Sequence, residues 1–430
     1  MNNQELIREI YSLNLTRHAV NTEKYIYDDM PKKLLNDMFA RLLADKKTGV
    51  VSVYFRLSDK LNEKKSPLTK IYVCTKNNCS ILKTTRNLHA YCSNINKSDY
   101  KQFKFMSESF KNELAKKLKK LGKNNIHQKI MSSKTNSKKR VVLHDKDLLI
   151  ELINEIRTIN LDELRIHPND DPRTREKKAK KLDTLNSLII LLFDLIAIPT
   201  IFNHYITKPE LNKNSNTSKE SFIECYDQHT DQPEDQQWHP DSLLAHKVHE
   251  NVDAMSRAHN NYLGVSFLPC LFCSIFLDTF NFDYRGRPET LYSTWRFPPN
   301  TETRQDLNVN FTQARDKIIN NEPLTHLRAK TFDPCLVSTQ NLYCDDICHL
   351  VNFFYGHHNN NRVLASFKNQ VINNFLELII DLKRIRDITL DQNRCVDCLR
   401  RQLTINNNNR LQRRMSHNGT DCHECINLYN

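Results

Sequence analysis

Two short apolar segments near the N-terminus determine the fold class: VVSVYFRL at residues 50–57 and KIYVC at residues 70–74. Both are rich in β-branched and aromatic residues, which predicts strands. Residues 30–43, just before them, repeat apolar side chains at helical spacing, and helical patterns return at 145–205 and 363–388. We therefore expect an α+β fold that is predominantly helical and multidomain.

Shifts in composition divide the 430 residues into six segments. The polar residues at 207–238 lack periodicity and mark the clearest boundary between domains. We expect an α+β domain (1–98), a basic helix and linker (99–144), a helical segment (145–206), a polar linker (207–238), a mixed and mainly helical domain (239–390), and a zinc-ribbon-like module (391–430).

The sequence predicts neither a secretion signal nor a membrane span. Glu5 and Glu9 stand where a signal peptide has its apolar core. The longest apolar run, 188–202, contains Asp194 and Pro199 and is shorter than the roughly 20 residues that cross a bilayer. We expect an intracellular protein that is not secreted and has no membrane partner. Its 13 cysteines are then metal ligands or buried thiols rather than disulfides.

Glycine content and net charge narrow the function further. The chain has six glycines, and no two of them lie within five residues of each other. Phosphate-binding loops need closely spaced glycines, so P-loop ATPases, dinucleotide-binding Rossmann enzymes and protein kinases are excluded. The formal net charge of +13 favours a polyanionic partner.

Most of the excess charge lies in residues 101–140, which hold 13 Lys and Arg against two acidic residues. The first half predicts an amphipathic helix that ends at Gly122, and residues 123–140 predict a flexible basic linker. This density predicts salt-dependent attraction to nucleic acid through counterion release. The alternative is a solvated surface or a nuclear import signal. The candidate nucleic-acid contacts are Lys116, Lys117, Lys119, Lys120, Lys138, Lys139 and Arg140.

Two CxxC pairs near the C-terminus give the strongest metal-binding signal. Cys395-Val-Asp-Cys398 and Cys422-His-Glu-Cys425 are separated by 23 residues, five of which are arginines. Four thiolates suit tetrahedral zinc (Zn²⁺), and the alternative is two unrelated thiol pairs. The spacing resembles the zinc ribbons of transcription elongation factors and RNA polymerase subunits. The loop at 414–420 lacks the carboxylates of cleavage-type ribbons, so the resemblance implies a binding ribbon.

A second candidate zinc site contains Cys74, Cys79, His89 and Cys92. Three thiols and one imidazole complete a tetrahedral zinc shell. Cys74 also ends a predicted strand, where a buried free thiol is common. The sequence therefore leaves two interpretations open at these positions, a metal site and a set of separate buried thiols.

A third group pairs His246 and His249 with Cys270 and Cys273. The sequence PCLFC at 269–273 resembles the zinc-binding half of nucleotide and nucleic-acid deaminases, which combine it with a His-x-Glu motif. Glu250 directly follows His249, so the His-x-Glu spacing is absent there. A structural site with two histidines and two cysteines, and an apolar core segment that happens to contain two thiols, both remain open.

The sequence DYRGR at 283–287 resembles the D-x-x-G-R motif that single-subunit, phage-type RNA polymerases place against the template. The remaining 143 residues are too few for the downstream catalytic parts of such a polymerase, so a complete enzyme of that class is excluded. Arg285 and Arg287 are then contacts to a nucleic-acid backbone, or part of an ordinary surface turn.

The basic, glycine-poor and cysteine-rich chain resembles in size and character the accessory late-transcription regulator of baculoviruses and nudiviruses. This resemblance implies a non-catalytic, zinc-stabilised subunit of a viral DNA-directed RNA polymerase. Its partners are then nucleic acid (DNA or RNA) and other polymerase subunits, in the host nucleus. Two alternatives remain: a zinc-dependent, deaminase-like enzyme that modifies nucleic acid, and a structural nucleocapsid protein.

Overall fold

In the computed structural model the chain has an α+β fold with mostly helices and a small mixed sheet, as the sequence predicts. The structure describes residues 3–14, 23–24, 30–45, 48–58, 66–76, 81–94, 108–132, 151–152, 154–156, 158–160, 162–164, 169–207, 222–227, 238–284, 286–287, 292, 294–320 and 331–332. The predicted C-terminal zinc ribbon and the helix predicted at 363–388 lie outside these ranges. No helix within them is long and apolar enough to cross a bilayer.

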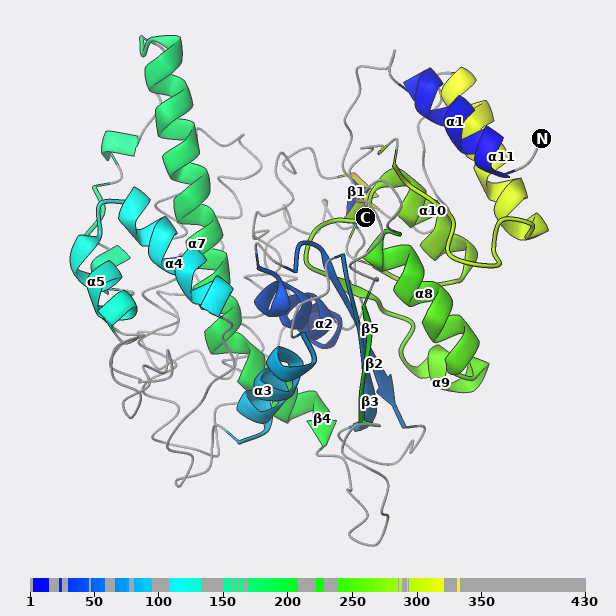
Figure 1. Ribbon diagram of the computed structural model, residues 1–430, viewed down its shortest axis with the longest axis horizontal. Coiled ribbons are helices and arrows are strands. Elements are labelled where there is room, and N and C mark those ends of the chain that lie inside the picture. Colours follow the sequence, from blue (N-terminus) through cyan, green and yellow to red (C-terminus); the bar gives the residue numbers. More distant parts are fainter. Residues whose placement is uncertain are drawn as a thin grey trace, which may run out of the picture. The chain divides into compact units, whose positions relative to one another are not determined.

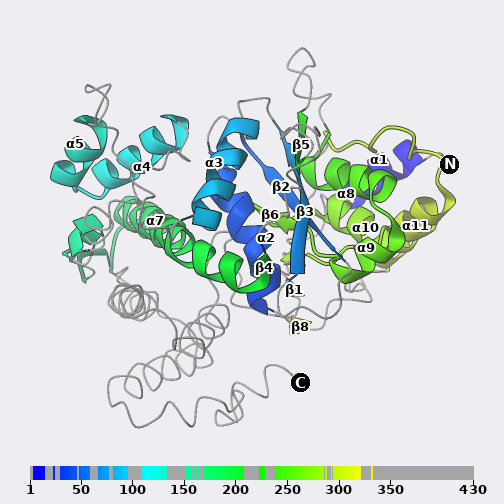
Figure 2. The ribbon, with the colours of Figure 1, turned by 90° about the horizontal axis from the view of Figure 1, so that it is seen from below.

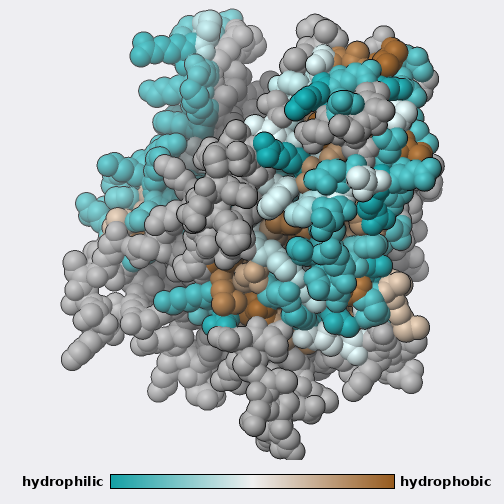
Figure 3. Space-filling view, turned by 45° about the vertical axis from the view of Figure 1, so that its right-hand side comes forward, coloured by the Kyte–Doolittle hydropathy of each residue, from teal (hydrophilic) through white to brown (hydrophobic). Residues whose placement is uncertain are grey.

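The chain divides into two compact units. The first, here called the sheet unit, comprises residues 1–96 and 197–339, and the second, the helical unit, comprises residues 97–196 and 340–430. On the face seen in Figure 3, the described residues are mainly hydrophilic, with smaller hydrophobic patches between them.

The sheet unit is organised around an antiparallel pair, β2 (Val51–Leu57) and β3 (Ser66–Thr75). Strand β6 (Gly264–Val265) pairs antiparallel with the outer side of β2. On the other side, β5 (Ile223–Asp227) and β4 (Ile206–Thr207) run parallel to β3. The two strands that the sequence predicts are therefore the two central partners of the sheet.

Helices lie on both sides of this sheet (Figures 1 and 2). Helix α2 (Met30–Leu43) contacts β2 and β6, and α3 (Ile81–Asn94) lies near it and contacts β5. On the opposite side, α8 (Pro240–Asn251) contacts β2 and β3, and α10 (Leu271–Thr279) packs against α8. This arrangement explains why β2 is buried on both faces.

Alternation along β2 divides its aromatic residues between the two layers. Phe55 meets Phe39 of α2 edge to face, with ring centroids 5.2 Å apart. The preceding Tyr54 faces the other way and contacts Phe282, with centroids 6.1 Å apart. All four side chains are buried, so the apolar run in β2 contributes to both halves of the core.

Strand β6 approaches α2 unusually closely, and a glycine permits this. A Cβ atom at Gly264 would lie 2.2 Å from the backbone carbonyl carbon of Asn36. The neighbouring Asp37 is fully buried and accepts hydrogen bonds from the backbone N–H of Val265 at 2.8 Å and from the hydroxyl of Tyr262 at 2.5 Å. These contacts fix the helix against the strand.

The rest of the sheet unit consists of smaller elements. Helix α1 (Asn3–Asn14) packs against α11 (Gln305–Ile319), and α9 (Ala254–His259) follows α8. Three two-residue strands form a separate antiparallel sheet. They are β7 (Gly286–Arg287), β1 (Glu23–Lys24) and β8 (Thr331–Phe332), in that order.

The described part of the helical unit contains α4 (Glu108–Lys120), α5 (Asn124–Ser132) and the short 3₁₀ helix η1 (Asp162–Leu164). It also contains most of α7 (Pro172–Tyr205), a 34-residue helix that continues past the unit boundary. Gly122 separates α4 from α5 with a φ of +77°, a conformation that glycine adopts without a steric penalty.

Two segments differ from the sequence-based expectations. Helix α5 lies within 123–140, where a flexible linker was predicted, and its buried Ile126 and Ile130 explain why it folds. Strand β5 lies within the predicted linker at 207–238 and pairs with β3 over five residues. Its short sequence, IECYD, has too little apolar periodicity to be recognised among polar neighbours.

Candidate metal centre

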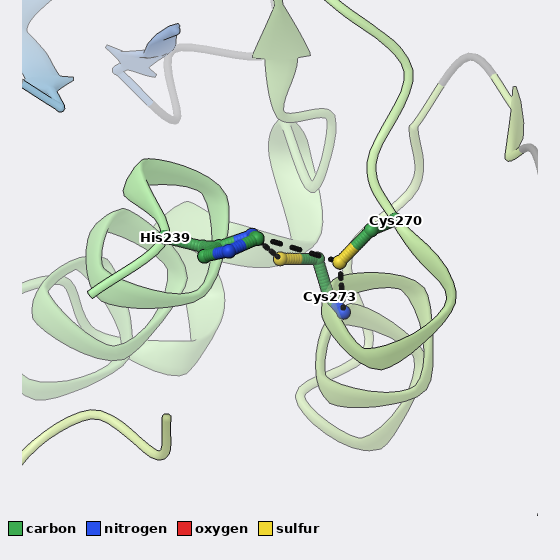
Figure 4. Close-up of side chains that lie close together, drawn as sticks. All are labelled: His239, Cys270 and Cys273. Carbon is green, nitrogen blue, oxygen red and sulfur yellow. Dashed lines mark hydrogen bonds between the residues drawn. The ribbon is translucent and has the colours of Figure 1, made fainter. Parts of the chain in front are cut away.

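Three potential metal ligands converge in the sheet unit: His239, Cys270 and Cys273 (Figure 4). Nδ1 of His239 lies 3.6 Å from Sγ of Cys270 and 3.4 Å from Sγ of Cys273. All three ligand atoms lie within 4.8 Å of one another. Within the described ranges, this is the one group of three or more His, Cys, Asp or Glu ligand atoms that are so close together.

The position of His239 follows from the proline after it. His239 is the N-cap of α8 and has an extended backbone, with φ −71° and ψ 131°. A proline disfavours helical geometry in the residue before it, and its own fixed φ suits the first helical position. Pro240 therefore starts the helix and leaves the imidazole of His239 at its N-terminal end.

The two cysteines are held in a similar way at the start of α10. Cys270 is the N-cap, and its sulfur accepts a hydrogen bond from the backbone N–H of Cys273 at 3.5 Å. Residues three apart lie on the same side of a helix, so both sulfurs point toward His239. The partial positive charge of a helix N-terminus also favours ionised thiols there.

The ligands differ in their exposure and charge. Cys273 is fully buried and Cys270 is 4% exposed. Burial raises the pKa of the Cys273 thiol well above its usual value. Burial alone would lower the pKa of His239, but the adjacent Cys273 outweighs it and raises that pKa. The two thiols of the centre carry negative charge when they ionise, and a bound cation would balance that charge.

A buried carboxylate lies beside the three ligands. Asp241 belongs to the first turn of α8 and is 4% exposed. Ser52, a fully buried residue of β2, donates a hydrogen bond to Oδ1 of Asp241, and the Cys273 thiol also interacts with this carboxyl. Burial raises the pKa of Asp241 to about 6, and the hydrogen bond from Ser52 opposes that rise. Asp241 is not a member of the ligand group.

Two aromatic residues complete the surroundings. Trp295 is fully buried, and its indole Nε1 donates to Sγ of Cys273 at 3.2 Å. Tyr292 lies against the ring of His239, with ring centroids 5.4 Å apart, and half of its surface is exposed. The centre therefore has a closed side at Trp295 and a solvent-facing side at Tyr292.

This donor set can hold a metal ion. Two sulfurs and one imidazole nitrogen are the ligands that transition metals of intermediate softness prefer. Among the described residues no fourth side chain of the ligand types joins the group. A zinc site with three protein ligands and one open position is typical of catalysis, whereas structural sites have four protein ligands.

The histidine in this group is not one that the sequence analysis considered. His246 lies two turns, roughly 10 Å, further along α8 than His239, since each helical residue adds about 1.5 Å. Nε2 of His246 is 3.1 Å from Oε1 of Glu250. His249 packs against Phe280, with ring centroids 4.7 Å apart. Pairing these two histidines with Cys270 and Cys273 is therefore wrong.

A usable signal was present in the sequence. His239-Pro-Asp241 supplies a histidine and an acidic residue with one residue between them, upstream of PCLFC. This signal is weak, because the acid is aspartate rather than glutamate and the histidine directly follows the predicted linker at 207–238. The structure places His239 at the N-cap of α8 and Asp241 in its first turn.

The second candidate zinc site is not assembled by the residues that the structure describes. Cys74 lies on β3 and Cys92 on α3, and both are fully buried. His89 contacts the rings of Phe202 and Phe222. Burial raises the pKa of Cys92 as it does that of Cys273, so the placement of the side chains, and not the pKa, separates the two sites.

Cys79, Cys395, Cys398, Cys422 and Cys425 lie outside the described residues. Cys74, His89 and Cys92 do not form a group of three ligand atoms within 4.8 Å of one another. The interpretation of Cys74 and Cys92 as separate buried thiols agrees with this placement.

The predicted nucleic-acid contacts fall into three groups. Lys116, Lys119 and Lys120 are exposed on α4. Lys117 is half-buried and donates a hydrogen bond to Ser187 of α7. Arg287 lies on β7, where its backbone is paired with Glu23. The remaining members, Lys138, Lys139, Arg140 and Arg285, lie outside the described residues.

Comparisons of the chain with protein-family models, curated proteins and solved structures found no match. The chemistry of the centre has to be inferred from its own residues.

Proposed function

We propose that the sheet unit is a zinc-dependent hydrolytic deaminase that acts on the amino group of a nucleobase. The observation that carries this proposal is the buried carboxylate of Asp241, which lies beside a three-ligand centre without belonging to it. Zinc deaminases of nucleobases use the same combination: a His/Cys/Cys ligand set and an acidic residue that does not bind the metal.

Zinc is the metal that best fits the ligand types. Thiolates exclude magnesium and calcium, which prefer oxygen ligands, and two thiolates with one imidazole suit tetrahedral zinc. In such a site, zinc supplies a water molecule whose pKa is lowered enough for nucleophilic attack at neutral pH.

The residues of this chain would handle the protons. The Asp241 carboxylate would accept a proton from the attacking water and return one to the departing amine. A pKa of about 6 leaves the carboxyl mostly ionised at neutral pH, which is the form that accepts a proton. Ser52 holds Oδ1 of Asp241 and so fixes the orientation of the carboxylate.

The overall reaction is a balanced hydrolysis. A C–O bond forms to the ring carbon that carries the amino group, the C–N bond breaks, and ammonia leaves. No electrons are gained or lost, so no redox cofactor is needed. Aspartate in place of the glutamate of known zinc deaminases shortens the reach of the acid by about one C–C bond, roughly 1.5 Å. The substrate must approach correspondingly closer to α8.

The test is a deamination assay on the purified, zinc-loaded protein. Cytidine, adenosine and a single-stranded oligodeoxynucleotide that contains cytosine are the probes, and ammonia release and base conversion are the readouts. Asp241→Asn should lower turnover by roughly 10²–10⁴-fold without loss of zinc, because the carboxylate is not a ligand. Glu250→Gln is the matched control and should behave as wild type, since Glu250 pairs with His246 and Lys247.

A structural metal site predicts a different result. Zinc would then be bound at this centre, no probe would be converted, and Asp241→Asn would change only stability. Either that result or full turnover by Asp241→Asn would rule out the deaminase.

A second, independent proposal concerns nucleic-acid binding by the helical unit. Lys116, Lys119 and Lys120, here called the α4 lysine surface, are exposed and form no ion pair within the part of the chain that the structure describes. Other lysines of this unit are neutralised by carboxylates; examples are Lys129 with Glu151 and Lys178 with Asp170. The unpaired charges favour a polyanionic partner.

A salt titration of oligonucleotide binding tests this surface. The double variant Lys119→Glu, Lys120→Glu should bind a single-stranded oligonucleotide more weakly. It should also lower the slope of log affinity against log salt by about 0.7 for each lost phosphate contact. Lys180→Glu is the control, because Lys180 is exposed but already paired with Glu176. Equal slopes for all three proteins would exclude the α4 lysine surface as a contact to nucleic acid. The role as a viral polymerase subunit stays a prediction from the sequence.

A further inference from the structure

The buried side of the metal centre contains a hydrogen-bond donor that the proposed chemistry does not use. Nε1 of Trp295 lies 3.2 Å from Sγ of Cys273. Both side chains are fully buried. We infer that Trp295 is a positioning residue that orients the Cys273 sulfur and tunes its bond to the metal. This inference rests on the metal centre of the proposed function.

The chemistry of the indole ring fixes the direction of this hydrogen bond. The indole nitrogen of tryptophan only donates, so the sulfur of Cys273 must be the acceptor. A thiol is a weak acceptor, whereas a thiolate carries a full charge and forms a charge-assisted hydrogen bond. The contact is therefore much stronger when Cys273 is ionised, which is the form that binds a metal.

Burial makes this donor important. Cys273 is fully buried, so no water reaches its sulfur to donate a hydrogen bond. In such an environment the indole N–H stabilises the negative charge of the sulfur when it binds a metal. A donor on a thiolate also withdraws electron density from sulfur, so a bound metal would keep more of its positive charge.

The position of Trp295 is rigid enough for this role. Its ring packs among Phe272, Phe297 and Phe311, with centroid distances of 5.4, 5.0 and 5.7 Å. Its backbone N–H donates to the carbonyl of Tyr292 at 3.1 Å, which fixes the turn that carries it. The same turn places Tyr292 at the solvent-facing side of His239. The indole thus links the aromatic core to the metal ligand.

The test replaces zinc with cobalt and follows the sulfur-to-cobalt charge-transfer absorption. Trp295→Phe keeps an aromatic ring but removes the donor. It should shift the charge-transfer band to longer wavelength, because the sulfur lone pairs are no longer stabilised. It should also weaken metal binding by roughly 10–100-fold, the usual effect of losing a hydrogen bond to a ligand. A variant with benzothienylalanine at position 295, which keeps the fused rings and lacks the N–H, should show the same shift if Trp295→Phe does not fold.

Phe311→Leu is the packing control. Phe311 is fully buried against Trp295 and makes no contact of its own with the sulfur that the structure records. This variant should lose stability while its charge-transfer band stays at the wild-type position.

The outcomes separate this inference from the proposed function. A wild-type protein that binds cobalt but converts no substrate contradicts the deaminase alone. An unchanged band and unchanged affinity in both position-295 variants contradict the role of Trp295 alone. Failure of the wild-type protein to bind cobalt or zinc overturns both.

Discussion

Two groups of cysteine and histidine in the sheet unit have similar spacing, and among the residues that the structure describes only one of them converges. Cys270 and Cys273 meet His239 at the first turns of two helices. His89 and Cys92 lie in the last two turns of α3, where His89 packs against aromatic rings and Cys92 is fully buried. Both helices space their pair three residues apart, so spacing alone does not distinguish a metal centre from core packing.

The two helices differ in the hydrogen-bond donors and in the helix dipole that surround the cysteine sulfur. At a helix N-terminus the backbone N–H groups are free to donate, and the helix dipole stabilises negative charge. Cys270 accepts such an N–H from Cys273. In the last turn of a helix, where Cys92 lies, these donors are already used and the helix dipole disfavours negative charge. A cysteine pair is therefore a stronger metal-binding signal when it starts a helix than when it lies within one.

The largest expected effect is on metal content. Cys273→Ala should lose about one equivalent of bound zinc relative to the wild-type protein, because two ligands cannot hold the ion in the absence of the third. Cys92→Ala should keep the wild-type amount. Elemental analysis of the purified proteins measures both. If the two variants lost zinc equally, the contrast between the two groups would disappear.

The next effect is on stability. Zinc at about 100 times its dissociation constant should stabilise the folded protein by about 2.7 kcal/mol, since it binds only the assembled centre. Thermal or denaturant unfolding with and without a chelator measures this difference. Cys92→Ala should retain the dependence on zinc, and Cys273→Ala should not. A chelator that left wild-type unfolding unchanged would show that the centre is unassembled in solution.

The smallest effect concerns the support of the carboxylate. Ser52→Ala should cost about 1–3 kcal/mol because it removes the hydrogen bond to a buried oxygen of Asp241, and it should also lower turnover. Thr85→Ala in α3 is the matched control. It removes a buried hydroxyl that donates to the carbonyl of Ile81 at 2.8 Å, far along the chain from the centre. Turnover that falls equally in both variants would indicate general destabilisation rather than loss of positioning.

The elements with strong local patterns could be predicted from the sequence. The helix predicted at residues 30–43 has the bounds of α2, and the two predicted strands are β2 and β3. These segments bury most of their apolar side chains. Because buried positions recur at the period of the helix or strand, the apolar residues repeat at the same period in the sequence. Strand β5 has no such period because its pairing partner, β3, supplies most of its stability from a distance in the sequence.

The candidate centre could be predicted only in part. Both cysteines were identified, but His239 was missed, because its role depends on α8 and α10 lying side by side. Nothing in the residues around His239 shows that its helix begins next to the one that starts at Leu271. Likewise the contribution of Trp295 depends on a contact across 22 residues of chain.

The absence of a side chain at Gly264 has a consequence for recognising relatives of this protein. Any larger residue there would push β6 away from Asn36, and the stretch that begins with β6 leads within a few residues to Pro269 and the paired thiols. A sequence that has the same cysteine pair but a larger residue at this position must place its metal ligands through a different packing of β6 against α2. Glycine at this position is thus a criterion for grouping distant homologues, and it does not depend on the residues that do the chemistry.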